Sequence, residues 1–293
     1  MVAFAVEVAL AGNPGSGKRK PPAGGHVYWT NPETSRGSGG PGIDTLGRAN
    51  RNGTAVDKSF ITDVVIPGAI AVDGTHVYWT NAESSAIGRA NLDGTHVDQS
   101  FIAVGGALEA LALDGHHVYW SSGGSGSTPA RIGRANINGQ QINPGFISAG
   151  PGTFIGGLAV NGHHIYWTNR DEGTVGQADL NGTDVRLGLI SGATAPTGLA
   201  LDRRHLYWAN NTTHATIARA TLNGSHANES FITGATEPFG IAVDSRHLYW
   251  TNYGTGKIGR AALNGSQVDQ SFIVAGATVE GGESAPMGVA VGS

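Results

Sequence analysis

The sequence contains six Tyr-Trp pairs, and together they use every tryptophan of the chain. The pairs are Tyr28-Trp29, Tyr78-Trp79, Tyr119-Trp120, Tyr166-Trp167, Tyr207-Trp208 and Tyr249-Trp250. Subtracting successive tryptophan numbers gives spacings of 50, 41, 47, 41 and 42 residues. A period of roughly 40–45 residues is typical of a propeller blade. The sequence is therefore expected to fold as six copies of one unit.

Each copy has the pattern of four short strands. In the unit that spans residues 240–273, short segments rich in β-branched and aromatic residues are bounded by Gly, Asn or Asp. Asn264-Gly265 lies between the last two segments, and Asn-Gly is the strongest two-residue hairpin signal because both residues tolerate positive φ. The pattern predicts an all-β, six-bladed β-propeller of four-stranded antiparallel blades.

The Tyr-Trp pair also predicts how blades contact each other. Alternate side chains of a strand point to opposite faces, so Leu248 and Trp250 should face one neighbouring blade and His247 and Tyr249 the other. Large residues on both faces are expected where a sheet is packed between two others. The pairs should therefore be wedges between blades.

Residues 70–95 resemble the low-density-lipoprotein-receptor class B, or YWTD, repeat, since strand order, the Tyr-Trp pair and the Leu-Asp-Gly turn occur together. The resemblance covers about residues 26–291 and implies a six-bladed propeller. It also favours an extracytoplasmic or secreted location, as in exported relatives. The family's aspartate is replaced throughout, by Asn31, Asn81, Asn169, Asn210, Asn252 and Ser122.

The order of segments predicts how the ring closes. Innermost strands should begin near Gly68, Glu109, Gly157, Gly198, Gly240 and Gly288. Because the repeats start on a second strand at His26, the C-terminal strand should complete the first blade. Residues 26–293 are then the propeller, and residues 1–25 are an N-terminal appendage or linker. The strand-like Phe4–Leu10 is expected to be an appendage or an outer strand.

The charge and hydropathy of the chain exclude two classes of partner. Charged residues make up 14% of the chain and the net charge is −4, which gives no basic footprint for nucleic acid. No stretch approaches the roughly 20 apolar residues of a membrane span, and Met1–Leu10, interrupted by Glu7, is a poor signal peptide. We expect a monomer that binds neither nucleic acid nor the membrane interior.

Residues repeated in every blade are interpreted as structural. A histidine precedes each Tyr-Trp pair, and an arginine recurs at Arg48, Arg89, Arg134, Arg219 and Arg260, with Gln177 in the fourth unit. On a sixfold ring, equivalent histidines should lie on the order of 10 Å apart, too far to share a zinc ion whose bonds are about 2.1 Å. The histidines should serve packing, and the arginines should bond to neighbouring blades.

Function is instead expected where the blades differ. At the mouth of the central channel the equivalent positions are Gly68, Glu109, Gly156, Thr197, Phe239 and Met287. Loops between second and third strands add Arg170, Asp171, His214 and Tyr253. The predicted ligand-binding residues are Glu109, Thr197, Phe239, Met287, Arg170, Asp171, His214 and Tyr253.

These residues favour a non-catalytic binding or interaction module for a protein, peptide or glycan ligand. The alternative is a channel-site hydrolase or lyase, like the lactonase propellers, centred on Glu109. Calcium requires about six oxygen ligands, and the mouth positions offer one carboxylate, so no metal site or cofactor is predicted. General acid–base chemistry would need a second titrating group nearby, so no catalytic residue is predicted either.

Overall fold

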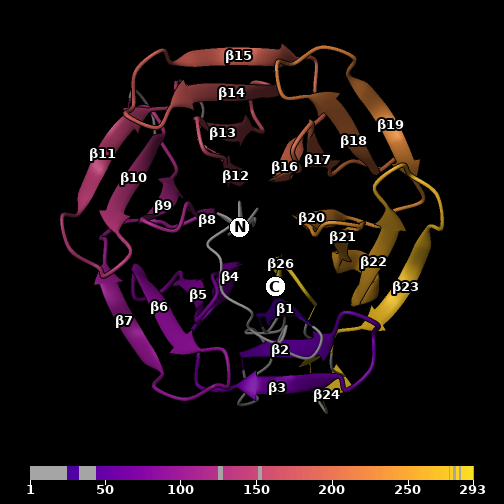
Figure 1. Cartoon of the computed structure of the whole chain (residues 1–293). Helices are drawn as coiled ribbons and strands as arrows, with labels where there is room; N and C mark the ends of the chain where they lie inside the picture. The colour runs from indigo at the N-terminus through magenta and orange to yellow at the C-terminus, as the bar shows by residue number, and fades with distance from the viewer. Residues whose placement is uncertain are drawn as a thin grey trace, which may run out of the picture.

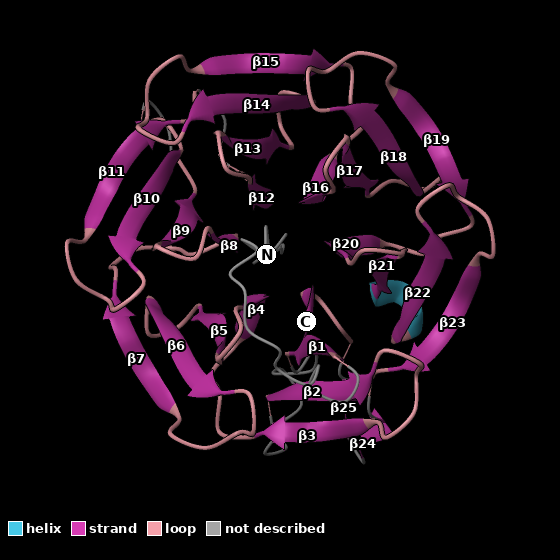
Figure 2. Cartoon of the chain, in the orientation of Figure 1, coloured by secondary structure: helices cyan, strands magenta, loops and turns pink. Residues whose placement is uncertain are grey.

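The computed structural model describes residues 25–32, 44–124, 128–150, 154–276, 278–279, 282–283 and 285–292. These residues form six four-stranded sheets arranged around a central axis (Figure 1). The predicted all-β, six-bladed propeller is confirmed. In the described residues the helical structure is confined to a single 3-10 turn, η1 (Tyr253–Thr255), as Figure 2 shows.

From the axis outward, the strands of each blade are as follows. Blade one contains β26 (Val289–Val291), β1 (His26–Asn31), β2 (Thr45–Asn50) and β3 (Asp57–Ile61). Blade two contains β4 (Pro67–Val72), β5 (His76–Asn81), β6 (Ala86–Asn91) and β7 (Asp98–Ala103). Blade three contains β8 (Leu111–Leu113), β9 (His117–Ser122), β10 (Arg131–Asn136) and β11 (Asn143–Ser148).

Blade four contains β12 (Gly157–Val160), β13 (His164–Asn169), β14 (Thr174–Asp179) and β15 (Arg186–Ser191). Blade five contains β16 (Pro196–Leu201), β17 (His205–Asn210), β18 (Thr216–Thr221) and β19 (Asn228–Thr233). Blade six contains β20 (Pro238–Val243), β21 (His247–Asn252), β22 (Lys257–Ala262) and β23 (Asp269–Val274). A separate short hairpin pairs β24 (Thr278–Val279) with β25 (Gly282–Glu283).

The ring closes through the C-terminal strand, as predicted. β26 pairs antiparallel with β1, which sets Trp29 opposite Val289 and Val27 opposite Val291. Closure leaves blade one with the same four strands as the others, so no innermost edge is exposed there. Phe4–Leu10 lies outside the described residues, and the boundary at residue 25 stays a prediction.

The Tyr-Trp pairs act as the predicted wedges. The buried apolar residues form six clusters, and each contains the tyrosine of one blade and the tryptophan of the next. Trp250 packs against blade five, whereas Tyr249 packs against blade one. Gly259 on the adjacent strand leaves room for the indole, because a Cβ there would lie 2.3 Å from Trp250. The core of this protein is therefore a set of six blade-to-blade interfaces.

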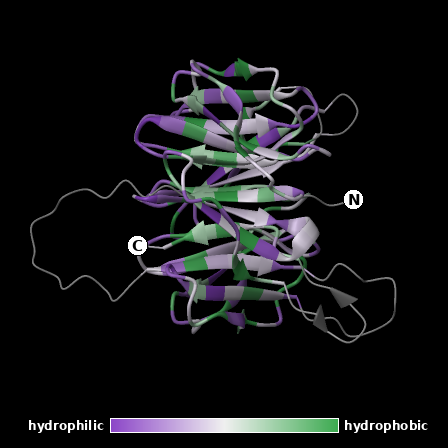
Figure 3. Cartoon of the chain, turned by 90° about the vertical axis from the view of Figure 1, so that its right-hand side faces the viewer, coloured by the Kyte–Doolittle hydropathy of each residue, from purple (hydrophilic) through white to green (hydrophobic). Residues whose placement is uncertain are grey.

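The disc has two faces of different construction, and Figure 3 shows it edge-on. We call the side where the chain enters the innermost strands the mouth face; second-to-third loops such as residues 253–256 lie there too. The opposite side, the turn face, carries innermost-to-second loops and the Asn-Gly turns such as Asn264-Gly265. The predicted site lies on the mouth face.

Candidate functional site

The strand register identifies six equivalent positions at the mouth face. On each innermost strand one residue pairs with the blade's tryptophan, as Leu111 does with Trp120. The residue two places earlier is the mouth position, and across the blades it is Gly68, Glu109, Gly156, Thr197, Phe239 or Met287. The same backbone position therefore carries different chemistry in almost every blade.

Glu109 is buried at its mouth position, with 9% of its surface exposed. Burial raises the pKa of its carboxyl group to about 8, which the hydrogen bond from the Ile155 N–H opposes and the negative charge of Asp171 reinforces. That backbone N–H donates to Oε2 across 2.9 Å. At neutral pH the Glu109 carboxyl group is therefore protonated in most molecules, and in this uncharged form it can donate a hydrogen bond.

Thr197 is fully buried, and its hydroxyl has a structural partner. In most blades a hydroxyl at the end of the second strand donates to a carbonyl of the next blade. These bonds join Thr30 to Gly68, Ser121 to Ile155, Thr168 to Thr197 and Thr251 to Met287. Blade five has Ala209 at this place, and there Thr197 Oγ1 lies 3.2 Å from the Pro238 carbonyl and 3.3 Å from that of Phe239. Thr197 thus supplies the bridge that Ala209 lacks.

Changing Thr197→Ala should lower the free energy of unfolding by about 1–2 kcal/mol, because it leaves buried carbonyls of the next blade without a donor. Adding Ala209→Thr should recover most of that loss by restoring the hydroxyl used in other blades. Urea unfolding of the single and double variants measures both effects. An Ala209→Thr change that gives no recovery would contradict the proposed exchange of roles.

An aromatic pair lies on the mouth face of blade six. The rings of Phe239 and Tyr253 meet edge-to-face, with centroids 5.5 Å apart, and both side chains are partly exposed. Burial, together with the negative charge of Glu237, raises the pKa of Tyr253. Met287 occupies the adjacent mouth position in blade one and is buried. The structure therefore brings Phe239 and Tyr253 together, with Met287 as their neighbour in the ring.

A second group lies on the mouth face of blade four. The guanidinium of Arg170 lies 5.7 Å from the ring centroid of Phe154, which is partly exposed. The next residue, Asp171, is exposed. Phe154 was not predicted, because it precedes the innermost strand at a position that no repeat pattern marks. His214 is exposed on the corresponding loop of blade five, beside Thr213.

The repeated histidines and arginines lie on the turn face in the predicted structural roles. Asp114 accepts backbone N–H bonds from His116 and His117 at 2.8 and 2.7 Å. The His117 ring lies 3.1 Å from Asp114 Oδ2. Arg134 Nη1 donates to the Leu180 carbonyl of the next blade at 3.2 Å. Equivalent arginine-to-carbonyl bonds start from Arg48, Arg219 and Arg260.

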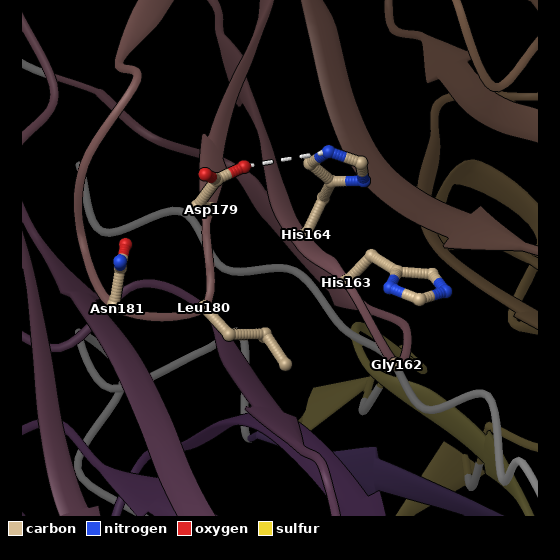
Figure 4. Close-up of a pocket in the computed structure, with 6 residues that line it drawn as sticks. All are labelled: Gly162, His163, His164, Asp179, Leu180 and Asn181. Atoms are coloured by element: carbon tan, nitrogen blue, oxygen red, sulfur yellow. Dashed lines mark ion pairs between the residues drawn. The ribbon is translucent and has the colours of Figure 1, made fainter.

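Blade four departs from this scheme and has a shallow pocket of about 450 Å³ on the turn face. Asn161 and Gln177 replace the usual aspartate and arginine. His164 instead pairs through Nε2 with Asp179 Oδ1 at 3.5 Å, and Figure 4 shows His163 beside them.

Among the described residues, no group of three or more His, Asp or Glu side chains is arranged to hold a metal ion. The same part of the chain contains no helix with the length and apolar character of a membrane span.

Fold and site together define a six-bladed β-propeller in which Tyr and Trp side chains pack between the blades and the residues at the channel mouth vary from blade to blade. The family model described as low-density lipoprotein receptor repeat class B matches residues 75–114. The chain thus resembles the YWTD repeat family, as the sequence indicated. A search of curated proteins found no match.

Solved structures give the same fold. A chain in the crystal structure of a nidogen/laminin complex aligns with a TM-score of 0.72 and 21% identity, covering 92% of this chain and 98% of that one. A gluconolactonase from Xanthomonas campestris aligns with a TM-score of 0.55 and 14% identity, covering 76% and 83% respectively. At these identities the likeness shows the fold alone.

Proposed function

We propose that this propeller is a binding module whose mouth face receives a protein or peptide. The observation that carries the proposal is the partly exposed Phe239–Tyr253 pair, held edge-to-face at 5.5 Å. Aromatic residues are enriched among those that contribute most to protein interfaces. Rings already packed against each other also lose little conformational freedom on binding.

The surrounding charges suggest what kind of peptide fits. The described mouth-face loops and third-strand starts carry the acidic residues Asp63, Glu83, Asp171, Glu172 and Glu237, and the basic residues Arg131, Arg170 and Lys257. Complementary charge across an interface mainly favours the correct partner and faster association. We therefore expect a ligand that presents apolar side chains to Phe239 and Tyr253, and basic side chains to the acidic loops.

One solved structure supports a protein as the partner. The propeller with a TM-score of 0.72 comes from a complex of nidogen with laminin. A fold of this class is thus found in a protein–protein complex, which favours a protein partner over a glycan for the present chain. The residues of this chain that would bind are its own, because site residues are grafted on a common fold.

Peptides selected from a random displayed library on the wild-type protein should be enriched in basic and apolar residues. Their affinity should fall at least about tenfold in the Phe239→Ser, Tyr253→Ser double variant, since buried aromatic anchors commonly contribute more than 1.4 kcal/mol. The matched control is Val268→Ser, which alters an apolar residue that is 44% exposed away from the mouth. Selection of no peptide, or equal affinity for both variants, would contradict the proposal.

The alternative, a lactonase-like hydrolase, rests on Glu109. Its carboxyl group has a pKa of about 8 and could act as a general acid near neutral pH. A hydrolase would release acid from gluconolactone at a rate that falls sharply in the Glu109→Gln variant. If the propeller is a binding module, the wild type and the Glu109→Gln variant should release acid from gluconolactone at the same rate as buffer alone.

A further inference from the structure

A pocket of about 390 Å³ lies on the turn face where blade six meets blade one. It is lined by Arg51 and Asn52 from blade one and by residues 244–247, Tyr249 and Arg260 from blade six. Its volume is within the range of small-molecule sites, roughly 300–1,000 Å³. The pocket is on the opposite side of the disc from the mouth face.

Arg51 makes this junction different from the other five. The strand register aligns Arg51 with Leu92, Ile137, Leu180, Leu222 and Leu263, which all are aliphatic. Arg51 is therefore a charged residue at a position that is apolar in the other five blades. A specific binding site is expected at positions where one copy of a repeated scaffold departs from the others.

The charges in the pocket do not balance. Arg51, Arg246 and Arg260 supply three guanidinium groups, whereas Asp244 is the one carboxylate in the lining. Asp244 Oδ1 already accepts the backbone N–H groups of Arg246 and His247, both at 2.7 Å. Asp244 Oδ2 accepts the Tyr249 hydroxyl at 3.1 Å.

The Arg51 guanidinium is incompletely used by the protein. Its Nη1 lies 3.8 Å from Asp244 Oδ2, and its Nη2 donates to the Gly292 carbonyl. Its Nε is shielded from solvent and has no hydrogen-bond partner. Arg260 Nη1 donates a hydrogen bond to the Arg51 carbonyl at 3.3 Å, and the Arg260 guanidinium lies over the Phe272 ring. Arg246 is exposed, and its side chain is available at the rim.

We propose that this pocket binds a small phosphate-bearing ligand through Arg51, Arg246 and Arg260. Planar guanidinium groups match phosphate oxygens in two parallel hydrogen bonds, and these charge-assisted bonds are stronger than neutral ones. The excess of positive charge favours a dianion. Because the pocket joins blade six to blade one, an occupied site would also hold the two ends of the ring together and raise the stability of the fold.

Inorganic phosphate is the probe, compared with chloride at equal ionic strength and pH 7. Phosphate should raise the Tm of the wild-type protein above the chloride value. Titration calorimetry should show phosphate affinity reduced at least about tenfold, or 1.4 kcal/mol, by Arg51→Leu, which installs the residue found in other blades. Arg246→Ser should reduce it similarly, and since Arg246 is exposed this variant keeps its fold.

The matched control is Arg204→Ser at the junction of blades five and six. Arg204 precedes His205 as Arg246 precedes His247, and Arg219 there donates to the Leu263 carbonyl as Arg260 does to that of Arg51. That junction has Leu263 in place of Arg51, so Arg204→Ser should change phosphate affinity less than about twofold. The proposal is wrong if phosphate and chloride stabilise the wild type equally, or if Arg204→Ser weakens binding as much as Arg246→Ser does.

Discussion

Removal of residues 286–293 is expected to abolish cooperative folding. The deletion takes away β26, whose residues Val289 and Val291 pair with β1 and are 0% and 5% exposed. It also removes the Met287 carbonyl that accepts the Thr251 hydroxyl at 2.9 Å, a bond between blades six and one. Blade one would lose its innermost strand, and the ring would lose its closure.

The size of the effect follows from the buried surface. Fully burying one valine side chain contributes roughly 1.5–3 kcal/mol, so Val289 and Val291 together account for about 3–6 kcal/mol. The deletion also uncovers Val27 and Trp29, which pack in the same cluster. Domains have total stabilities of roughly 5–15 kcal/mol, so this lost burial, added to the newly exposed edge of blade one and the loss of ring closure, is expected to remove the cooperative transition.

Circular dichroism in the near ultraviolet and urea unfolding measure the outcome. The truncated protein should lose the signal of its ordered tryptophans and its sharp transition. Deletion of residues 1–20 is the control and should preserve both. A truncated protein that unfolds at the wild-type midpoint would contradict closure by β26.

The second large effect concerns Glu109. Its carboxyl pKa is raised from 4.5 to about 8 in the folded state, mainly by burial. Between these two pH values the folded protein holds a proton that the unfolded chain has released, so stability falls as pH rises through this window. At about 1.36 kcal/mol for each pH unit, the cost by pH 8 is roughly 3–5 kcal/mol.

Glu109→Gln removes this titration while keeping an oxygen that can accept the Ile155 N–H bond. The difference in unfolding free energy between variant and wild type should therefore grow by about 3–5 kcal/mol from pH 4.5 to pH 8, and stay constant above that. Urea unfolding across the range gives the difference, and other titrating groups cancel in it. A difference independent of pH would show that Glu109 is ionised in the folded protein.

The sequence predicts the ring and its interior because both depend on local periodicity. Alternation along one strand assigns Trp250 and Tyr249 to opposite faces, and a closed ring then places each between blades. Closure by Gly288–Val291 follows from counting innermost strands against second strands. These features need no knowledge of which particular atoms meet.

The site is less accessible to sequence, because its chemistry depends on contacts between distant residues. Thr197 on the innermost strand takes the hydrogen-bonding role that a second-strand hydroxyl has in other blades, because Ala209 has no hydroxyl. The sequence of a single repeat does not reveal this substitution of roles. Burial raises the Glu109 pKa, and the N–H group that opposes this shift comes from Ile155 in the neighbouring blade. Arg51 could have been found from sequence, as an arginine aligned with four leucines and an isoleucine, but its unpaired Nε is visible only in three dimensions.

Repeated residues build the ring, and we propose that varied residues on the mouth face bind the partner. Hydrogen–deuterium exchange on the protein with a selected peptide bound tests this directly. We predict slowed exchange in residues 237–239 and 253–256, and in residues 154–156 and 170–172, with the Asn-Gly turns of the other face unchanged. Protection confined to the turn face or the outermost strands would contradict the account.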